Sequence, residues 1–192
     1  MPASPAGLRD DGRTPGPVSE PAWRLPARGV LLAAIVLLVA AEVGGASMAR
    51  FKLELARWAR SEMLARPAVH GLVGVRDVDE RALDEALFRF DAGLRLFHMH
   101  AEGMALVIIV TTTVATTLSR RRPVRRALVA LLTVGGIGYP LGYLLWSALI
   151  PVYGVERGKA IAEWMVWIPF GGATIVALLG LTAVVGVRVV RR

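Results

Sequence analysis

Cysteine is absent from this chain of 192 residues. Its absence excludes disulfide bonds, thiolate metal ligands, cysteine nucleophiles and haem attached through a CxxCH motif. The sequence also lacks the GxxxxGKS/T phosphate loop, the GxSxG nucleophile elbow and the HExxH zinc motif. The common sequence signatures of nucleotide binding, ester hydrolysis and zinc proteolysis are therefore missing.

Polar residues are also scarce, because 55% of the residues are hydrophobic and the mean hydropathy is +0.53. Such values are typical of a membrane protein rather than an ordinary globular domain. The net charge of +8 and the pI near 11.1 would suit a nucleic-acid partner. However, the arginines cluster beside apolar segments, where they also mark the cytoplasmic side of a membrane. We therefore expect the lipid bilayer, and no nucleic acid, as the partner.

Four apolar segments have about the ~20 residues that a helix needs to cross a bilayer. They predict an all-α, polytopic membrane protein built as a four-transmembrane-helix bundle. The proline-rich residues 1–28 are expected to form a flexible cytoplasmic tail, and residues 29–192 the membrane domain. The predicted spans are residues 29–49, 96–118, 127–150 and 162–187.

The first apolar segment allows a second interpretation. Arginines precede it, and Ser47, Met48 and Ala49 offer small residues at the spacing of a signal-peptide cleavage site. Cleavage there would remove Glu42 and leave three spans. The length of the segment and of the tail before it favours a retained span.

Residues 50–95 are amphipathic and form the predicted outer segment. Its first part is expected to continue the first helix or to lie along the membrane interface, with Phe51 and Trp58 dipping in. Pro67 and the following glycines should break that helix. Asp77 or Asp79 is expected to cap a new helix, which runs unbroken into the second span.

Charged and aromatic residues predict the orientation. Five arginines lie in residues 119–126, and three more end the chain, which places both termini in the cytoplasm of a cell with an inner (plasma) membrane. The abundance of alanine, glycine and arginine suggests a GC-rich bacterial genome. The aromatic residues agree, because they fall at the outer ends of spans three and four, where an interfacial belt belongs: Trp146, Tyr153, Trp164 and Trp167.

Ionisable residues inside predicted spans are the candidates for function, since a charge near the bilayer centre costs ~2.5 to 3.5 kcal/mol. Glu42 and Glu102 lie roughly 10 Å below the outer surface at 1.5 Å per helical residue, and His98 and His100 shortly precede Glu102. Tyr143 of span three is level with both glutamates, Tyr139 lies on the same span, and Trp167 of span four lies just above. We expect these seven side chains to line an outer-leaflet pocket.

Several chemistries remain open for this pocket. His98 and Glu102 share a helix face and, with Glu42 or His70, could bind a divalent metal. His98 and His100 point roughly 200° apart on a helix, so they cannot grip one ion together, but either could be an axial haem ligand. The histidines could instead bond to loop carbonyls or lipid, or relay protons with Glu42 and Glu102 in a small transporter.

A further hypothesis concerns the small residues Gly138 and Gly142. Their spacing favours close contact between helices. This face could join copies into a homo-oligomer, or it could be the packing surface of an accessory or assembly subunit.

Two segments carry a resemblance to a known family. HAEGM at residues 100–104 and GYPLGYLLW at residues 138–146 resemble the hydroxylaminobenzene mutase and styrene oxide isomerase group, which are compact four-span bacterial proteins. The resemblance implies haem b held by a histidine on the second span, with ferric iron as a Lewis acid, and assembly as a trimer. It makes His100 the candidate axial ligand and places Tyr143 in the substrate pocket.

Two differences limit this resemblance. The family carries asparagines shortly after the histidine and in the third-span aromatic motif. Here Leu106 and Val107 occupy the first place and residues 140–142 the second. The substrate chemistry of the family therefore does not carry over to this chain.

Overall fold

The protein is all-α in the computed structural model, which describes residues 22–190, and this part of the chain contains no strand. Four of its helical stretches are long and apolar enough to cross a membrane. The predicted four-helix class is confirmed. The elements are α1 (Arg28–Leu64), η1 (Pro67–His70), α2 (Arg76–Leu118), α3 (Arg122–Tyr153), α4 (Val155–Ala162), η2 (Glu163–Gly171) and α5 (Gly172–Val190).

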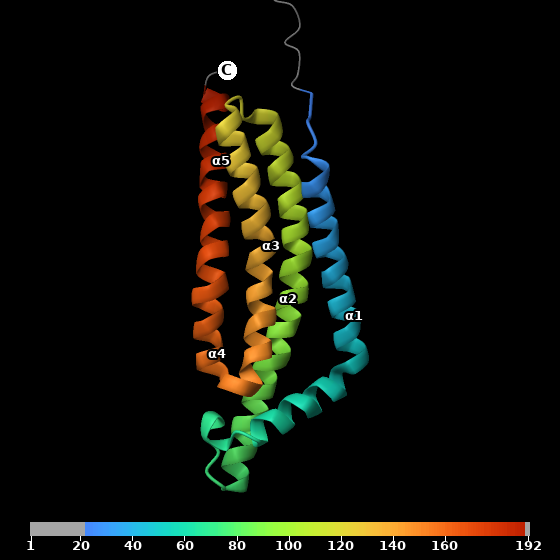
Figure 1. Ribbon diagram of the computed structural model, residues 1–192, viewed down its shortest axis with the longest axis vertical. Helices are drawn as coiled ribbons and strands as arrows, with labels where there is room; N and C mark the ends of the chain where they lie inside the picture. The colour runs from blue at the N-terminus through green and yellow to red at the C-terminus, as the bar shows by residue number, and fades with distance from the viewer. Residues whose placement is uncertain (1–21, 191–192) are drawn as a thin grey trace, which may run out of the picture.

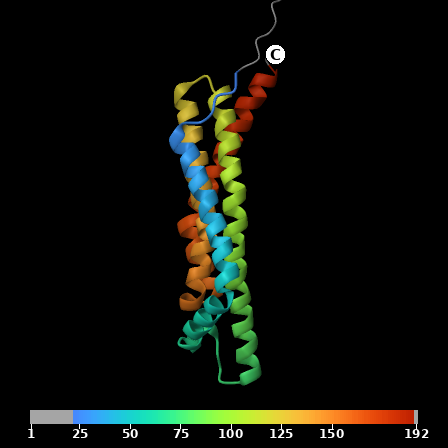
Figure 2. The same ribbon diagram turned by 90° about the vertical axis from the view of Figure 1, so that its right-hand side faces the viewer.

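Helices α2 and α3 lie side by side at the centre of the molecule, as Figures 1 and 2 show. Helix α1 packs mainly against α2, and the stretch from α4 to α5 packs mainly against α3. The first and last described residues lie at the same end of the bundle (Figure 1). Three clusters of buried apolar residues follow the central pair along its length.

Helix α1 is much longer than the apolar segment that predicted it. It continues past Ala49 to Leu64, with one non-helical residue, Phe51 (φ −111°, ψ 19°). Beyond this kink the helix turns across the lower end of the bundle in Figure 1. The prediction that the amphipathic segment continues the first helix is confirmed. Its apolar face holds it there, because Ala59 and Met63 are fully buried among residues of α2 and α3.

The start of α2 differs from the predicted cap. Val75 is the N-cap residue, and neither Asp77 nor Asp79 caps the helix through its side chain. Instead, the Asp79 carboxylate accepts hydrogen bonds from the backbone N–H groups of Val73 (2.8 Å) and Gly74 (2.9 Å). Gly74 has a positive φ of 81°, which turns the loop back over the first helical turn. From there α2 runs unbroken to Leu118, as expected.

The fourth span is not a regular α-helix. Helical structure begins at Val155, earlier than predicted, and residues Glu163–Gly171 form a π-helix, η2, that contains Pro169. π-helical turns are rare and occur frequently at functional sites. This stretch carries Trp167 and Phe170, both of which contact α3.

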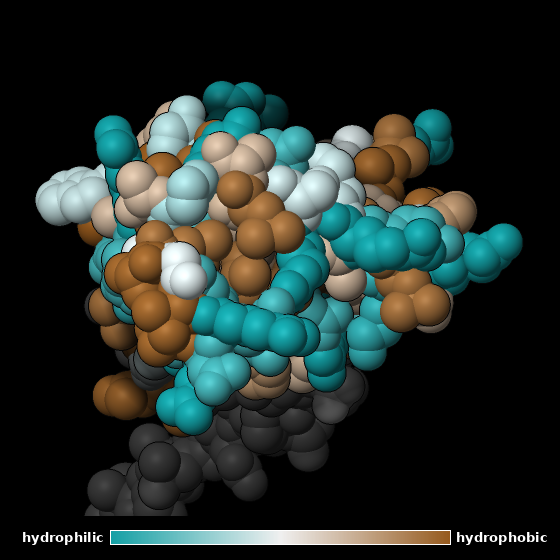
Figure 3. All heavy atoms as spheres, turned by 90° about the horizontal axis from the view of Figure 1, so that it is seen from below, coloured by the Kyte–Doolittle hydropathy of each residue, from teal (hydrophilic) through white to brown (hydrophobic). Residues whose placement is uncertain are grey.

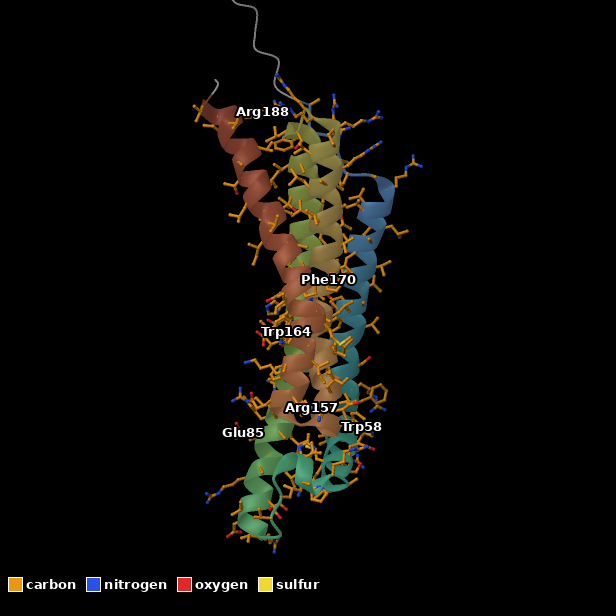
Figure 4. All side chains as sticks on the ribbon, turned by 60° about the vertical axis from the view of Figure 1, so that its left-hand side comes forward. Trp58, Glu85, Arg157, Trp164, Phe170 and Arg188 are labelled. Carbon is orange, nitrogen blue, oxygen red and sulfur yellow. The ribbon has the colours of Figure 1, made fainter. Side chains whose placement is uncertain are left out.

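The molecule's surface fits a bilayer. Large apolar side chains are exposed along α1 and α5, among them Ile35, Val39, Ile175 and Leu179. At the lower end of the bundle, hydrophilic side chains surround patches of hydrophobic atoms (Figure 3). Figure 4 shows Arg188 at the opposite end. The chain is therefore a multi-pass membrane protein.

Candidate functional site

The two histidines of α2 face different helices. His98 lies against α1, and His100 lies against α3. This agrees with the roughly 200° expected between residues two apart on a helix. The predicted single pocket is therefore divided into two groups of side chains on either side of α2.

The first group is a pair, His98 and Glu102. The Nδ1 atom of His98 lies 2.9 Å from the Ala41 carbonyl oxygen on α1. Because a carbonyl only accepts hydrogen bonds, Nδ1 must donate its proton there. The other ring nitrogen, Nε2, lies 3.5 Å from Glu102 Oε1. The imidazole is thus fixed between the backbone of one helix and a carboxyl on its own helix.

Gly45 on α1 leaves the space that the His98 ring occupies. A Cβ atom at residue 45 would lie 2.8 Å from His98 Cε1 and 2.9 Å from Nδ1. Any side chain there would push the imidazole off the α1 backbone. The first apolar segment was not expected to contribute to the site in this way, although its Gly44–Gly45 pair is a sequence signal for close helix contact.

The second group centres on His100. Its Nδ1 lies 2.8 Å from the Leu96 carbonyl oxygen and donates to it, so in the neutral ring Nε2 has the lone pair. No hydrogen-bond partner within residues 22–190 occupies Nε2. The ring lies against Tyr143, with centroids 4.5 Å apart and planes at 30°, and meets the edge of Tyr139 at 5.7 Å.

Aromatic side chains of α3 and η2 extend this group. The hydroxyls of Tyr139 and Tyr143 are 3.0 Å apart and share a hydrogen bond. The ring centroids of Tyr143 and Trp167 lie 4.9 Å apart, and those of Trp167 and Trp146 lie 6.1 Å apart. The Trp167 indole nitrogen is buried and has no hydrogen-bond partner in the described part of the chain. We call the set of His100, Tyr139, Tyr143, Trp146 and Trp167 the aromatic cluster.

Gly138 and Gly142 make room for this cluster. A Cβ atom at residue 138 would collide with the ring of Phe170, and one at residue 142 would lie 2.5 Å from Trp167 Cδ1. The face that was expected to join copies of the chain is therefore covered by the chain's own fourth span. Small residues serve contacts within a chain and between chains equally well, and a homo-oligomer stays a prediction.

The remaining candidates lie apart from both groups. Glu42 is exposed on α1, with no hydrogen bond or ion pair among the described residues. His70 lies in η1, where Nε2 contacts the Pro151 carbonyl oxygen at 3.1 Å and ties the outer segment to α3. Within residues 22–190, no three His, Asp or Glu side chains are grouped so that they could hold a metal ion. The predicted metal set is brought together only as His98 and Glu102.

Binding a metal through one histidine, as an axial haem ligand does, differs from building a site of three side chains. Metal-bound histidines commonly donate one ring N–H to a carbonyl and coordinate through the other nitrogen. His100 has this arrangement, with Nε2 available, whereas both nitrogens of His98 have neighbours. The donor chemistry around His100 therefore fits an axial haem ligand better than that around His98.

One buried contact was not foreseen from the sequence. Ser147 on α3 donates a hydrogen bond of 2.7 Å to the Phe90 carbonyl oxygen, beside Gly93. This contact fixes α2 against α3 directly beside the aromatic cluster. A lone serine between apolar residues gives no pattern that would identify it.

Comparison of the chain with protein families, with curated proteins and with solved structures found no match.

Proposed function

We propose that this protein spans a bacterial inner membrane four times, with both ends in the cytoplasm. The arginines of residues 120–126 and Arg188 lie at one end, where Arg188 also donates a hydrogen bond of 2.7 Å to the Leu118 carbonyl oxygen. Trp146 and Trp164 lie toward the other end. A retained first span is supported because Ala34, Leu37 and Ala41 are buried against α2.

We further propose that the protein binds haem b through His100 and acts as an isomerase-like enzyme. The observation that carries this proposal is the state of the imidazole: Nδ1 is held by the Leu96 carbonyl, and Nε2 is unengaged inside the membrane. A ring fixed in this way is oriented for coordination before the ligand arrives. The family resemblance of residues 100–104 points to the same histidine.

The chain's own residues would prepare the site in three ways. The stacked Tyr143 ring holds the His100 plane, and the hydroxyl pair of Tyr139 and Tyr143 can donate one hydrogen bond to a substrate oxygen. Apolar neighbours keep water away. Haem, when bound, would supply a Lewis-acidic iron.

The test is an absorption spectrum of the detergent-purified protein, oxidised and reduced, after expression with sufficient haem. His98→Ala is the matched control, because His98 lies on the same helix at the same depth. We expect a Soret band in the wild type and in His98→Ala, and its loss in His100→Ala. A colourless wild type, or a band that persists in His100→Ala, would contradict the proposal.

A second candidate function, proton transfer across the outer leaflet, is favoured by the His98–Glu102 contact of 3.5 Å. Carboxyl and imidazole groups inside membrane spans are common members of proton relays. In proteoliposomes with an imposed pH gradient, Glu102→Gln should slow proton flux and His100→Ala should not. Equal flux in Glu102→Gln and the wild type would exclude this function.

A further inference from the structure

Two adjoining cavities lie beneath the kink of α1. Their volumes are about 270 Å³ and about 350 Å³. Both lie near the ~300 Å³ lower limit of typical small-molecule pockets. They have four lining residues in common, so they form one continuous groove between α1 and α2: Met48, Leu55, Phe90 and Leu94.

The groove changes in polarity along its length. The inner cavity is lined almost entirely by apolar groups, including Gly44, Phe97 and Ala148, with Ser47 as its one hydroxyl-bearing residue. The outer cavity has a charged rim formed by Lys52, Asp84 and Asp91. An occupant would therefore have a charged end in the outer cavity and an apolar part in the inner cavity.

The groove begins at the membrane interface and runs outward. Its lining on α2 extends from Asp84 to Phe97, which is about 20 Å at 1.5 Å per residue, and the second predicted span begins at residue 96. Trp58, which lines the inner cavity and meets Phe90 with ring centroids 6.2 Å apart, belongs to the residue type enriched at this interface.

The rim charges indicate the kind of headgroup. Asp91 forms an ion pair with Arg95 on its own helix. Lys52 and Asp84, from opposite walls, have no ion pair within the described residues. A zwitterionic headgroup satisfies both, since its phosphate can accept from the Lys52 ammonium and its own ammonium can donate to Asp84.

We propose that this groove binds one zwitterionic glycerophospholipid of the phosphatidylethanolamine class, with an acyl chain under α1 and the headgroup between Lys52 and Asp84. The site is distinct from the His100 cluster and does not depend on haem. The lipid would fill the space that the two helices leave.

The first experiment distinguishes a bound lipid from the surrounding bilayer. The full-length protein is reconstituted in an equimolar mixture of phosphatidylethanolamine and phosphatidylglycerol, washed extensively in detergent, and examined by native mass spectrometry. We expect one retained phosphatidylethanolamine. The double variant Ser47→Phe/Ala148→Phe fills the inner cavity and should lose it, whereas Ala40→Phe, which adds the same ring on an exposed part of α1, should keep it.

The second experiment uses charge, so that it does not rely on a repacked interior. Lys52→Gln and Asp84→Asn should each lower the retained phosphatidylethanolamine several-fold, and Asp84→Asn should shift retention toward phosphatidylglycerol. Lys159→Gln, the same change at the chain's other lysine, should have no effect. Loss of all lipid from the wild type on washing, equal retention in the filled variant, or retention unchanged by both charge variants would overturn the proposal.

Discussion

Replacing Gly142 with alanine tests the contact between α3 and the fourth span. The new Cβ atom would lie 2.5 Å from Trp167 Cδ1 and 2.9 Å from Cε2. The indole cannot move aside freely, because its ring also contacts Tyr143 and Trp146. Overpacking of this kind costs about 1 to 3 kcal/mol, whereas alanine gains about 0.5 to 1 kcal/mol over glycine in a helix. We expect a net loss of about 1 to 2 kcal/mol.

Gly103→Ala is the matched control, since a Cβ atom there meets nothing within 4 Å. That variant keeps only the helical gain, so the two should differ by the overpacking cost of about 1 to 3 kcal/mol. For a chain of this size the gap corresponds to about 2 to 12 °C in apparent Tm. The assay is thermal unfolding in lipid–detergent micelles, followed by fluorescence-detected size exclusion.

A double-mutant cycle with Trp167→Ala identifies the cause. If the indole is the obstacle, Gly142→Ala should cost much less in the Trp167→Ala background, which gives a coupling free energy above ~0.5 kcal/mol. Equal Tm values for Gly142→Ala and Gly103→Ala would refute the steric reasoning. So would a cost that is the same in both backgrounds.

Three other results are expected. His70→Ala removes the hydrogen bond to α3, worth about 1 kcal/mol, and should speed trypsin cleavage of the outer segment without lowering the Tm of the membrane domain by more than a few degrees. Gly45→Ala should displace His98, which 15N spectra of the imidazole would register as a changed ring environment; an unchanged signal would contradict the contact. Because the chain has no cysteine, Glu85→Cys and Arg122→Cys can report topology, and only the former should react with an impermeant maleimide in intact cells.

The fold could be predicted largely from hydrophobicity, because a bilayer demands about 20 consecutive apolar residues per helix. The same rule could not show where helices continue outside the membrane. Nothing in the sequence around Phe51 marks a kink, which depends on the burial of Ala59 and Met63 against distant residues. The π-helix of the fourth span likewise has no local pattern, since packing against the α3 glycines decides its register.

The depth of the candidate residues in the membrane could be predicted from the sequence, but not which of them contact one another. Helix rise alone puts His98, His100 and Tyr143 at one level, and the structure brings His100 and Tyr143 into contact. Which neighbour each histidine faces depends on the order in which the helices pack, and a single helix does not contain that information. For the same reason the spacing of Gly138 and Gly142 indicates close approach without naming the partner helix.

Helix α2 has one consequence for mechanics. Its 43 residues form an unbroken rod of about 64 Å, roughly twice the ~30 Å hydrocarbon core. The rod has no break between Arg76 at its N-terminal end and His100, which lies about 36 Å away along the axis. A molecule that displaced the N-terminal end of α2 sideways would therefore tilt the whole helix and shift His98 and His100 against their neighbours.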